Sequence, residues 1–137
     1  MRILAIDPGD KRIGLAITDP TGTIATPLQV LLHVSREQDA QTIKELATRN
    51  QVVLVVIGVA LDEDGGDTPS SRKARRLGDT LASILDVKII YEDEAGSTRE
   101  ARETALTAGF RQRERKGHLD QMAAAILLQR YLDKVDR

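Results

Sequence analysis

Cysteine is absent from the 137-residue sequence, and aromatic residues are scarce, with two tyrosines, one phenylalanine and no tryptophan. The lack of cysteine excludes disulfide bonds and thiolate metal sites, and it is compatible with a reducing compartment. The scarcity of aromatic rings argues against a surface that binds nucleic acid by stacking bases on side chains. A nucleic acid bound to this chain would therefore be recognised mainly through its phosphates and the shape of its backbone.

An excess of charge of one sign is also missing, because 20 Lys and Arg residues against 21 Asp and Glu residues leave a net charge of −1. The chain therefore lacks the global basic field of many nucleic-acid-binding proteins, and any anion-binding site must be local. No apolar run approaches the roughly 18 residues of a membrane span, and no signal-peptide pattern precedes the first predicted strand. We expect a single cytoplasmic domain, residues 1–137, with a real core and no membrane partner.

The N-terminal part of the sequence predicts three strands joined by short turns. The three runs of strand-forming residues are 3–6, 13–17 and 23–34. Strands joined by such short turns pair antiparallel, so we expect an antiparallel meander. Ser35 with Gln38 then resembles a capping box, which predicts a helix that ends near Asn50.

The rest of the sequence alternates predicted strands and helices. Val52–Val59 is a nearly continuous β-branched run, typical of a central strand that is buried on both faces in a parallel arrangement. Thr68 and Pro69 suit the cap and first position of a helix. The remaining predicted elements are a strand at 87–92, a helix at 97–109, an exposed mobile loop at 109–117 and a last helix at about 119–132.

The segment around Asp7 combines residues that shape a turn with residues that could bind a metal and a phosphate. Asp7 ends the first apolar run, and Gly9, Lys11 and Arg12 follow it. Asp7 could simply cap the turn, with Gly9 supplying a positive φ angle. Gly14, inside the second predicted strand, indicates a close approach by another backbone or a ligand. This segment alone does not decide between a turn and a site.

Acidic residues recur where apolar structure stops. Asp7 ends the first strand, Asp93 and Glu94 end the fifth, and Asp120 stands in the first turn of the last predicted helix. Each has an ordinary explanation, since strand ends meet solvent and acids favour helix N-termini. In a mixed sheet, however, neighbouring strand ends converge, and clustered carboxylates repel one another unless a divalent cation lies between them. Oxygen ligands favour Mg²⁺ or Mn²⁺ over zinc.

Four motifs in a fixed order span nearly the whole chain. They are Asp7-x-Gly9-x-Lys11-Arg12-x-Gly14, Val55-Val-Ile-Gly58, Asp93-Glu94 followed by Ser97-Thr98-x-Glu100-Ala101, and Lys116-Gly117-x-x-Asp120-x-x-Ala123-Ala-Ala. With these motifs the chain resembles the YqgF-type pre-16S ribosomal RNA nucleases, a family also described as Holliday-junction-resolvase-like. The chain departs from the family pattern at Ala95 and Gly96, where the family often has Arg-Leu, and at Val59 and Ala60, where it often has Leu-Pro.

The resemblance implies an α/β, RNase H-like fold: a five-stranded mixed sheet, first three strands antiparallel, with helices on both faces. It implies a nuclease that hydrolyses phosphodiester bonds with Mg²⁺ or Mn²⁺ and leaves a 5′-phosphate and a 3′-hydroxyl. Asp7, Glu94 and Asp120 are the implied catalytic residues and metal ligands. The expected partners are structured RNA, namely the 5′ end of pre-16S rRNA, and ribosomal precursor particles. Branched DNA is the alternative substrate, and the protein is expected to be a monomer or a homodimer.

Cations close to these acids are the candidate substrate contacts. The candidate substrate-binding residues are Gly9, Lys11, Arg12, Arg111, Arg113, Arg115 and Lys116. A second group of cations on the helix after Pro69 is more simply a solvated face. Its members are Arg72, Lys73, Arg75 and Arg76. His118 could be a proton shuttle but is more simply an exposed histidine, and His33 carries no functional signal. The loop acids are expected to be solvated or to cap the next helix; they are Asp62, Glu63, Asp64 and Asp67.

Two other classes of function stay open at this point. An actin-like or sugar-kinase-like nucleotide-binding module shares the fold and an Asp-x-Gly phosphate loop, but such proteins need two domains and a second glycine-rich loop, which this sequence lacks. A catalytically silent nucleic-acid or ribosome-assembly module is compatible with Ala95 and Gly96.

Overall fold

Five strands form one mixed sheet. The computed structural model describes the backbone of residues 1–94 and 112–135 and the side chains of residues 1–94 and 122–135. The strands are β1 (Arg2–Pro8), β2 (Arg12–Thr18), β3 (Ala25–Leu32), β4 (Val52–Val59) and β5 (Lys88–Asp93). Their order is β3-β2-β1-β4-β5; β1, β2 and β3 pair antiparallel, whereas β4 pairs parallel to both β1 and β5. The predicted mixed sheet, its antiparallel meander and its interior fourth strand are confirmed.

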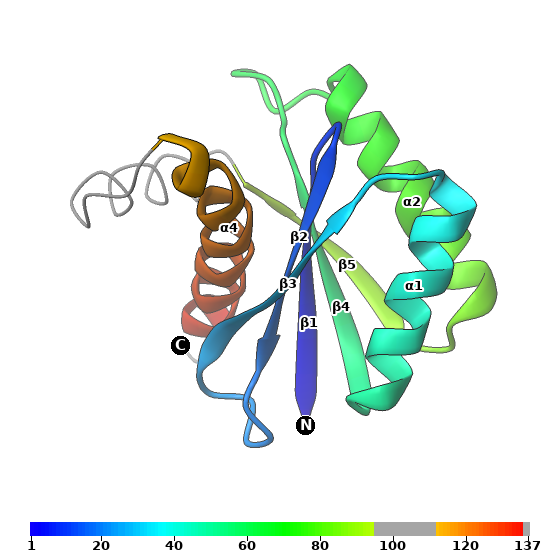
Figure 1. Ribbon diagram of the computed structural model, residues 1–137, viewed down its shortest axis with the longest axis vertical. Helices are drawn as coiled ribbons and strands as arrows, with labels where there is room; N and C mark the ends of the chain where they lie inside the picture. The colour runs from blue at the N-terminus through cyan, green and yellow to red at the C-terminus, as the bar shows by residue number, and fades with distance from the viewer. Residues whose placement is uncertain (95–111, 136–137) are drawn as a thin grey trace.

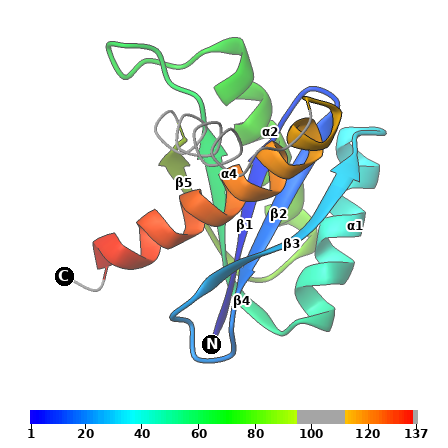
Figure 2. The ribbon, with the colours of Figure 1, turned by 60° about the vertical axis from the view of Figure 1, so that its left-hand side comes forward.

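Helices cover both faces of this sheet. Helices α1 (Arg36–Arg49) and α2 (Pro69–Ile84) lie side by side on one face, and α4 (Gln112–Val135) crosses the other (Figures 1 and 2). The first residues of α4 lie toward the end of the sheet at which β1 finishes (Figure 1). Among the described residues, no helix has both the length and the apolar character that crossing a membrane requires.

Alternation along β1 divides its apolar side chains between two cores. Leu4 and Ile6 are fully buried in the core beneath α1 and α2, whereas Ile3 and Ala5 are buried in the core beneath α4. Full burial of a Leu or Ile side chain stabilises the fold by roughly 1.5–3 kcal/mol. Because successive strand residues point to opposite faces, the next residue, Asp7, falls on the α4 face.

The predicted N-terminal caps of α1 and α2 are present. Ser35 Oγ accepts a hydrogen bond from the Gln38 amide at 3.1 Å at the start of α1. Thr68 Oγ1 accepts from the Ser71 amide at 3.0 Å, and Ser71 Oγ accepts from the Thr68 amide at 2.8 Å. These two bonds form a reciprocal capping box, and Pro69 begins α2 where a missing N–H is harmless.

Two predicted boundaries are wrong. Strand β3 is shorter than the predicted run of residues 23–34, because Asp19 Oδ1 accepts the amides of Thr23 and Ile24 at 2.8 and 2.9 Å within the preceding turn. Helix α4 begins at Gln112, so residues 112–117 are helical and not the predicted loop. The Gln, Arg, Glu and Lys residues of this stretch are good helix formers, which outweighs the roughly 1 kcal/mol that Gly117 costs. The predicted helix at 97–109 lies outside the described residues.

Candidate active site

Asp7 is half-buried near the end of β1. Its partner in the antiparallel β1–β2 ladder is Gly14. Directly opposed residues share a face, and their Cβ positions are about 4.5–5.5 Å apart. Because Gly14 has no side chain, β2 places nothing directly beside the Asp7 carboxylate. The close approach that the sequence indicates at Gly14 therefore falls next to the first candidate metal ligand.

Glu94 follows β5 directly, and the end of β4 holds it in place. Its amide donates to the Val59 carbonyl at 3.0 Å, which extends the parallel ladder by one bond. A Cβ added at Gly58 would lie 2.5 Å from Glu94 Oε2, 3.2 Å from Glu94 Cβ and 3.0 Å from Leu127 Cδ2. Only glycine at position 58 leaves room for the Glu94 carboxylate between β4 and α4.

The Glu94 carboxylate is poorly solvated and poorly paired. Its Oε2 atom is buried without a hydrogen-bond partner among the described residues. Burial, and after it a hydrogen bond with Asp7 and the negative charges of Asp7 and Asp93, together raise the pKa of Glu94 from 4.5 to about 10. Asp7 and Glu94 therefore form a close acidic pair that, in the metal-free protein, retains a proton.

An acidic pair of this kind fits a divalent cation. Mg²⁺ and Mn²⁺ bind carboxylate oxygens, and a cation would compensate the charge that burial disfavours and provide a partner for Oε2. Within the described side chains, no third Asp, Glu, His or Cys joins the pair. The third predicted ligand, Asp120, is the ninth residue of α4 and not in its first turn as predicted, and its side chain is outside the described part.

The cations that follow Asp7 lie on the tight β1–β2 turn. The Gly9 amide donates to the Arg12 carbonyl at 2.8 Å, so it is engaged in closing the turn. Arg12 begins β2 on the same face as Gly14 and Asp7, and Lys11 is exposed. Neither cation has an ion-pair partner among the described residues. The sequence predicts four further substrate contacts. Arg111 lies outside the described residues. For Arg113, Arg115 and Lys116 the structure describes the backbone but not the side chains.

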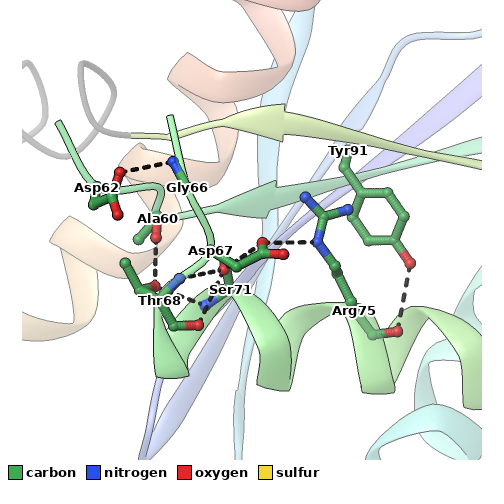
Figure 3. Close-up of polar contacts among 8 residues, drawn as sticks. All are labelled: Ala60, Asp62, Gly66, Asp67, Thr68, Ser71, Arg75 and Tyr91. Carbon is green, nitrogen blue, oxygen red and sulfur yellow. Dashed lines mark hydrogen bonds and ion pairs between the residues drawn. The ribbon is translucent and has the colours of Figure 1, made fainter. Parts of the chain in front are cut away.

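Hydrogen bonds engage two of the four acids of the loop before α2, Asp62 and Asp67 (Figure 3). Asp62 Oδ1 accepts from the amides of Asp64 and Gly66 at 3.0 and 2.7 Å, and Asp67 Oδ1 accepts from Ser71 Oγ at 2.8 Å. The Ser71 hydroxyl and then the Arg75 guanidinium hold the pKa of the Asp67 carboxyl below its ordinary value. None of these four acids is the N-cap of α2, which is Thr68; Asp67 instead holds the hydroxyl of Ser71, the second member of the capping box.

The four cations of α2 have different surroundings. Arg75 Nε lies 3.1 Å from Asp67 Oδ1, and its guanidinium lies over the Tyr91 ring, 5.0 Å from the centroid (Figure 3). Arg75 therefore has a structural role. Lys73 and Arg76 line a pocket instead, together with His33. The sequence offered no functional signal for His33, and it gave no reason to separate the members of this cluster.

Comparison with known proteins places the chain in a family. Residues 1–134 match the family model described as "RuvX: Holliday junction resolvase". The chain belongs to this family. It is 37% identical over 133 residues to a "Putative pre-16S rRNA nuclease" of Halothermothrix orenii, covering 97% of this chain and 95% of the relative. A protein of the same name from an Anaeromyxobacter species is 39% identical over 133 residues, covering 97% of each chain.

A solved structure shares the architecture of this RuvX-family chain. Thermus thermophilus RuvC in complex with a Holliday junction substrate superposes with a TM-score of 0.64 at 17% identity, covering 99% of this chain and 96% of RuvC. At this identity the likeness concerns the fold alone. The RNase H-like fold that the sequence motifs imply is thereby confirmed.

Proposed function

We propose that the chain is a metal-dependent nuclease that hydrolyses phosphodiester bonds in structured nucleic acid, with the 5′ end of pre-16S rRNA as its substrate. The observation that carries this proposal is the acidic pair of Asp7 and Glu94 at one end of the sheet, where a buried Glu94 oxygen has no hydrogen-bond partner in the described part of the chain. The names of the relatives support the choice of RNA.

Asp120 is proposed as the third ligand from its position in α4. It precedes Leu127 by two helical turns, so the two positions fall on the same face of the helix. Leu127 is buried in the core beneath α4, and its Cδ2 atom is one of the atoms that a Cβ at Gly58 would meet, next to the Glu94 carboxylate. The Asp120 position is therefore on the sheet-facing side of α4, toward the end at which β1 finishes.

In the proposed reaction, Asp7, Glu94 and Asp120 hold Mg²⁺ or Mn²⁺ beside the scissile phosphate. A bound divalent cation supplies a water of lowered pKa and stabilises negative charge on phosphate oxygens. Arg12 and Lys11 attract the phosphate from the β1–β2 turn, whose shape Gly9 maintains. Arg111, Arg113, Arg115 and Lys116 are proposed to bind the flanking backbone, which predicts binding that weakens steeply with salt.

The test is a cleavage assay with Mn²⁺ or Mg²⁺ that offers an RNA carrying the 5′ end of pre-16S rRNA and a four-way DNA junction. Asp7→Asn and Glu94→Gln are expected to lower cleavage at least about 100-fold, whereas the matched control Asp64→Asn, in an exposed loop, retains it. Full activity of Asp7→Asn would reject the assigned metal centre. An inactive parent protein that binds no Mn²⁺ would reject the nuclease and favour a silent binding module.

DNA junction cleavage is the second candidate, because the matching family model is described as a Holliday junction resolvase. Symmetric cleavage of a junction calls for a two-fold dimer, whereas trimming an RNA end does not. Cleavage of the DNA junction in preference to the RNA, by a protein that sediments as a dimer, would replace the RNA assignment.

A further inference from the structure

A pocket of about 290 Å³ opens on the α1/α2 face of the sheet, across the sheet from Asp7. It lies between the β1–β2 turn, the connection from β3 to α1, and the first turns of α2. Pro8, Gly9 and Asp10 form one wall, and Ser35 and Ser70 contribute hydroxyl groups. Its volume is close to the lower end of the roughly 300–1,000 Å³ that small-molecule sites occupy.

The floor of this pocket is apolar and its rim is cationic. Ile13, Ala74 and Leu77 line it and are 2, 2 and 6% exposed. The cations of the rim are Arg36, Lys73 and Arg76. Two acids, Asp10 and Asp39, also line the pocket, so its charged lining carries a net charge of +1, from three cations and two acids.

The two acids are engaged by their neighbours. Asp10 Oδ1 lies 3.4 Å from Lys73 Nζ. Asp39 is only 4% exposed; its Oδ2 lies 2.5 Å from His33 Nδ1, and its Oδ1 accepts from the Val34 amide at 3.1 Å. This buried carboxylate fixes the orientation of the His33 ring, whose other nitrogen remains available for a further hydrogen bond. By contrast, Arg76 is exposed and pairs with nothing in the described part of the chain.

We propose that this pocket binds a nucleotide, with the phosphate against Lys73 and Arg76 and the base over the apolar floor. A phosphate accounts for the cations, in particular for the unpaired Arg76, but leaves the apolar floor unused. A base accounts for the floor, and the planar guanidinium of Arg36 at the rim can stack on it. Since no Phe, Tyr or Trp is among the lining residues, the affinity is expected to be in the micromolar to millimolar range.

This site goes beyond the proposed nuclease centre, because it is on the other face of the sheet and needs no metal. Its occupant is either a free nucleotide or the terminal nucleotide of a nucleic-acid strand, and both present the same phosphate and base.

The test is isothermal titration calorimetry of the full chain in EDTA with AMP, adenosine, inorganic phosphate and a 5′-phosphorylated hexanucleotide. The nuclease-deficient Asp7→Asn variant is expected to bind AMP as the parent protein does, so the two proposals can fail separately.

The variant that tests the pocket is Lys73→Ala with Arg76→Ala, and its matched control is Arg72→Ala with Lys88→Ala. All four residues are exposed, and both variants remove two positive charges, but only the first pair lines the pocket. We expect the pocket variant to bind AMP at least tenfold more weakly and the control to change the dissociation constant less than twofold. Adenosine and inorganic phosphate should each bind at least tenfold more weakly than AMP.

Three results would overturn the proposal: no binding of AMP, binding of inorganic phosphate as tight as that of AMP, or an equal loss in the control variant. Displacement of AMP by the phosphorylated hexanucleotide would support the site and identify a strand end as its occupant. Binding of AMP without such displacement would support the site and identify a free nucleotide.

Discussion

Replacing Glu94 by Gln should change how the stability of the metal-free protein depends on pH. The folded protein holds a proton on Glu94 far above its ordinary pKa of 4.5, because the carboxyl group is buried beside Asp7. The unfolded chain releases this proton above pH 4.5. In this interval the folded state binds more protons, so its stability is greatest below the unfolded pKa and falls as the pH rises toward the folded pKa.

The magnitude follows from one proton. A difference of one bound proton changes the free energy of unfolding by about 1.4 kcal/mol per pH unit, which amounts to about 2.7 kcal/mol between about pH 5.5 and 7.5. Glu94→Gln should remove this loss. The free energy of unfolding of the variant should therefore increase relative to that of the parent protein as the pH rises. Asp7→Asn should remove only part of the slope, because burial, and not Asp7, is the largest cause of the raised pKa.

The assay is urea unfolding in EDTA at several pH values, with Glu63→Gln as the matched control. Glu63 is exposed in the loop before α2, so its replacement should leave the slope unchanged. Titrating groups that do not interact with Glu94 contribute equally to the parent protein and the variant and cancel in the difference. Equal slopes for the parent protein and Glu94→Gln would show that Glu94 is solvated, and would remove the main argument for a cation at this site.

Three further substitutions test particular contacts. Gly58→Ala should weaken Mn²⁺ binding, measured by calorimetry, because the added Cβ would displace the Glu94 carboxylate. The same Cβ would press on Leu127, so urea unfolding should show a loss of roughly 1–3 kcal/mol in stability. Unchanged Mn²⁺ affinity would contradict this role of Gly58. Thr68→Ala should cost about 0.5–2 kcal/mol through loss of the α2 cap while leaving Mn²⁺ affinity intact. Gly9→Ala should impair both Mn²⁺ and AMP binding, since its Cβ would lie 2.5 Å from the Arg12 carbonyl oxygen; an effect on only one ligand would show that the turn does not serve both sites.

The parts of the fold that could be predicted are those encoded over a few neighbouring residues. The β-branched run Val52–Val59 has the bounds of β4, and Thr68 with Pro69 starts α2, because burial pattern and cap chemistry are local properties. The predicted start of α4 is wrong, because the glycines and charges of residues 109–117 favour a loop, whereas the residues from Gln112 onward have a high intrinsic helix propensity that prevails.

The parts that could not be predicted depend on which strands become neighbours. Asp7 and Glu94 could be nominated from strand ends and family motifs, but the space at Gly58 exists only because β4 lies between β1 and β5. A glycine at the end of a β-branched run was the available signal for that space. For His33 there was no such signal, because its role follows from a carboxylate that α1 buries beside it.

The β1–β2 turn links the two faces of the sheet. Strand alternation places Asp7 on the α4 face, whereas the next residues, Pro8 and Gly9, line the pocket on the α1/α2 face. One backbone hydrogen bond, from the Gly9 amide to the Arg12 carbonyl, closes the turn. After the turn, Arg12 lies on the same face of the sheet as Asp7. Because Pro8 and Gly9 follow Asp7 directly in the chain, one short turn contributes residues to both candidate sites, and a substitution that distorts this turn is expected to disturb both.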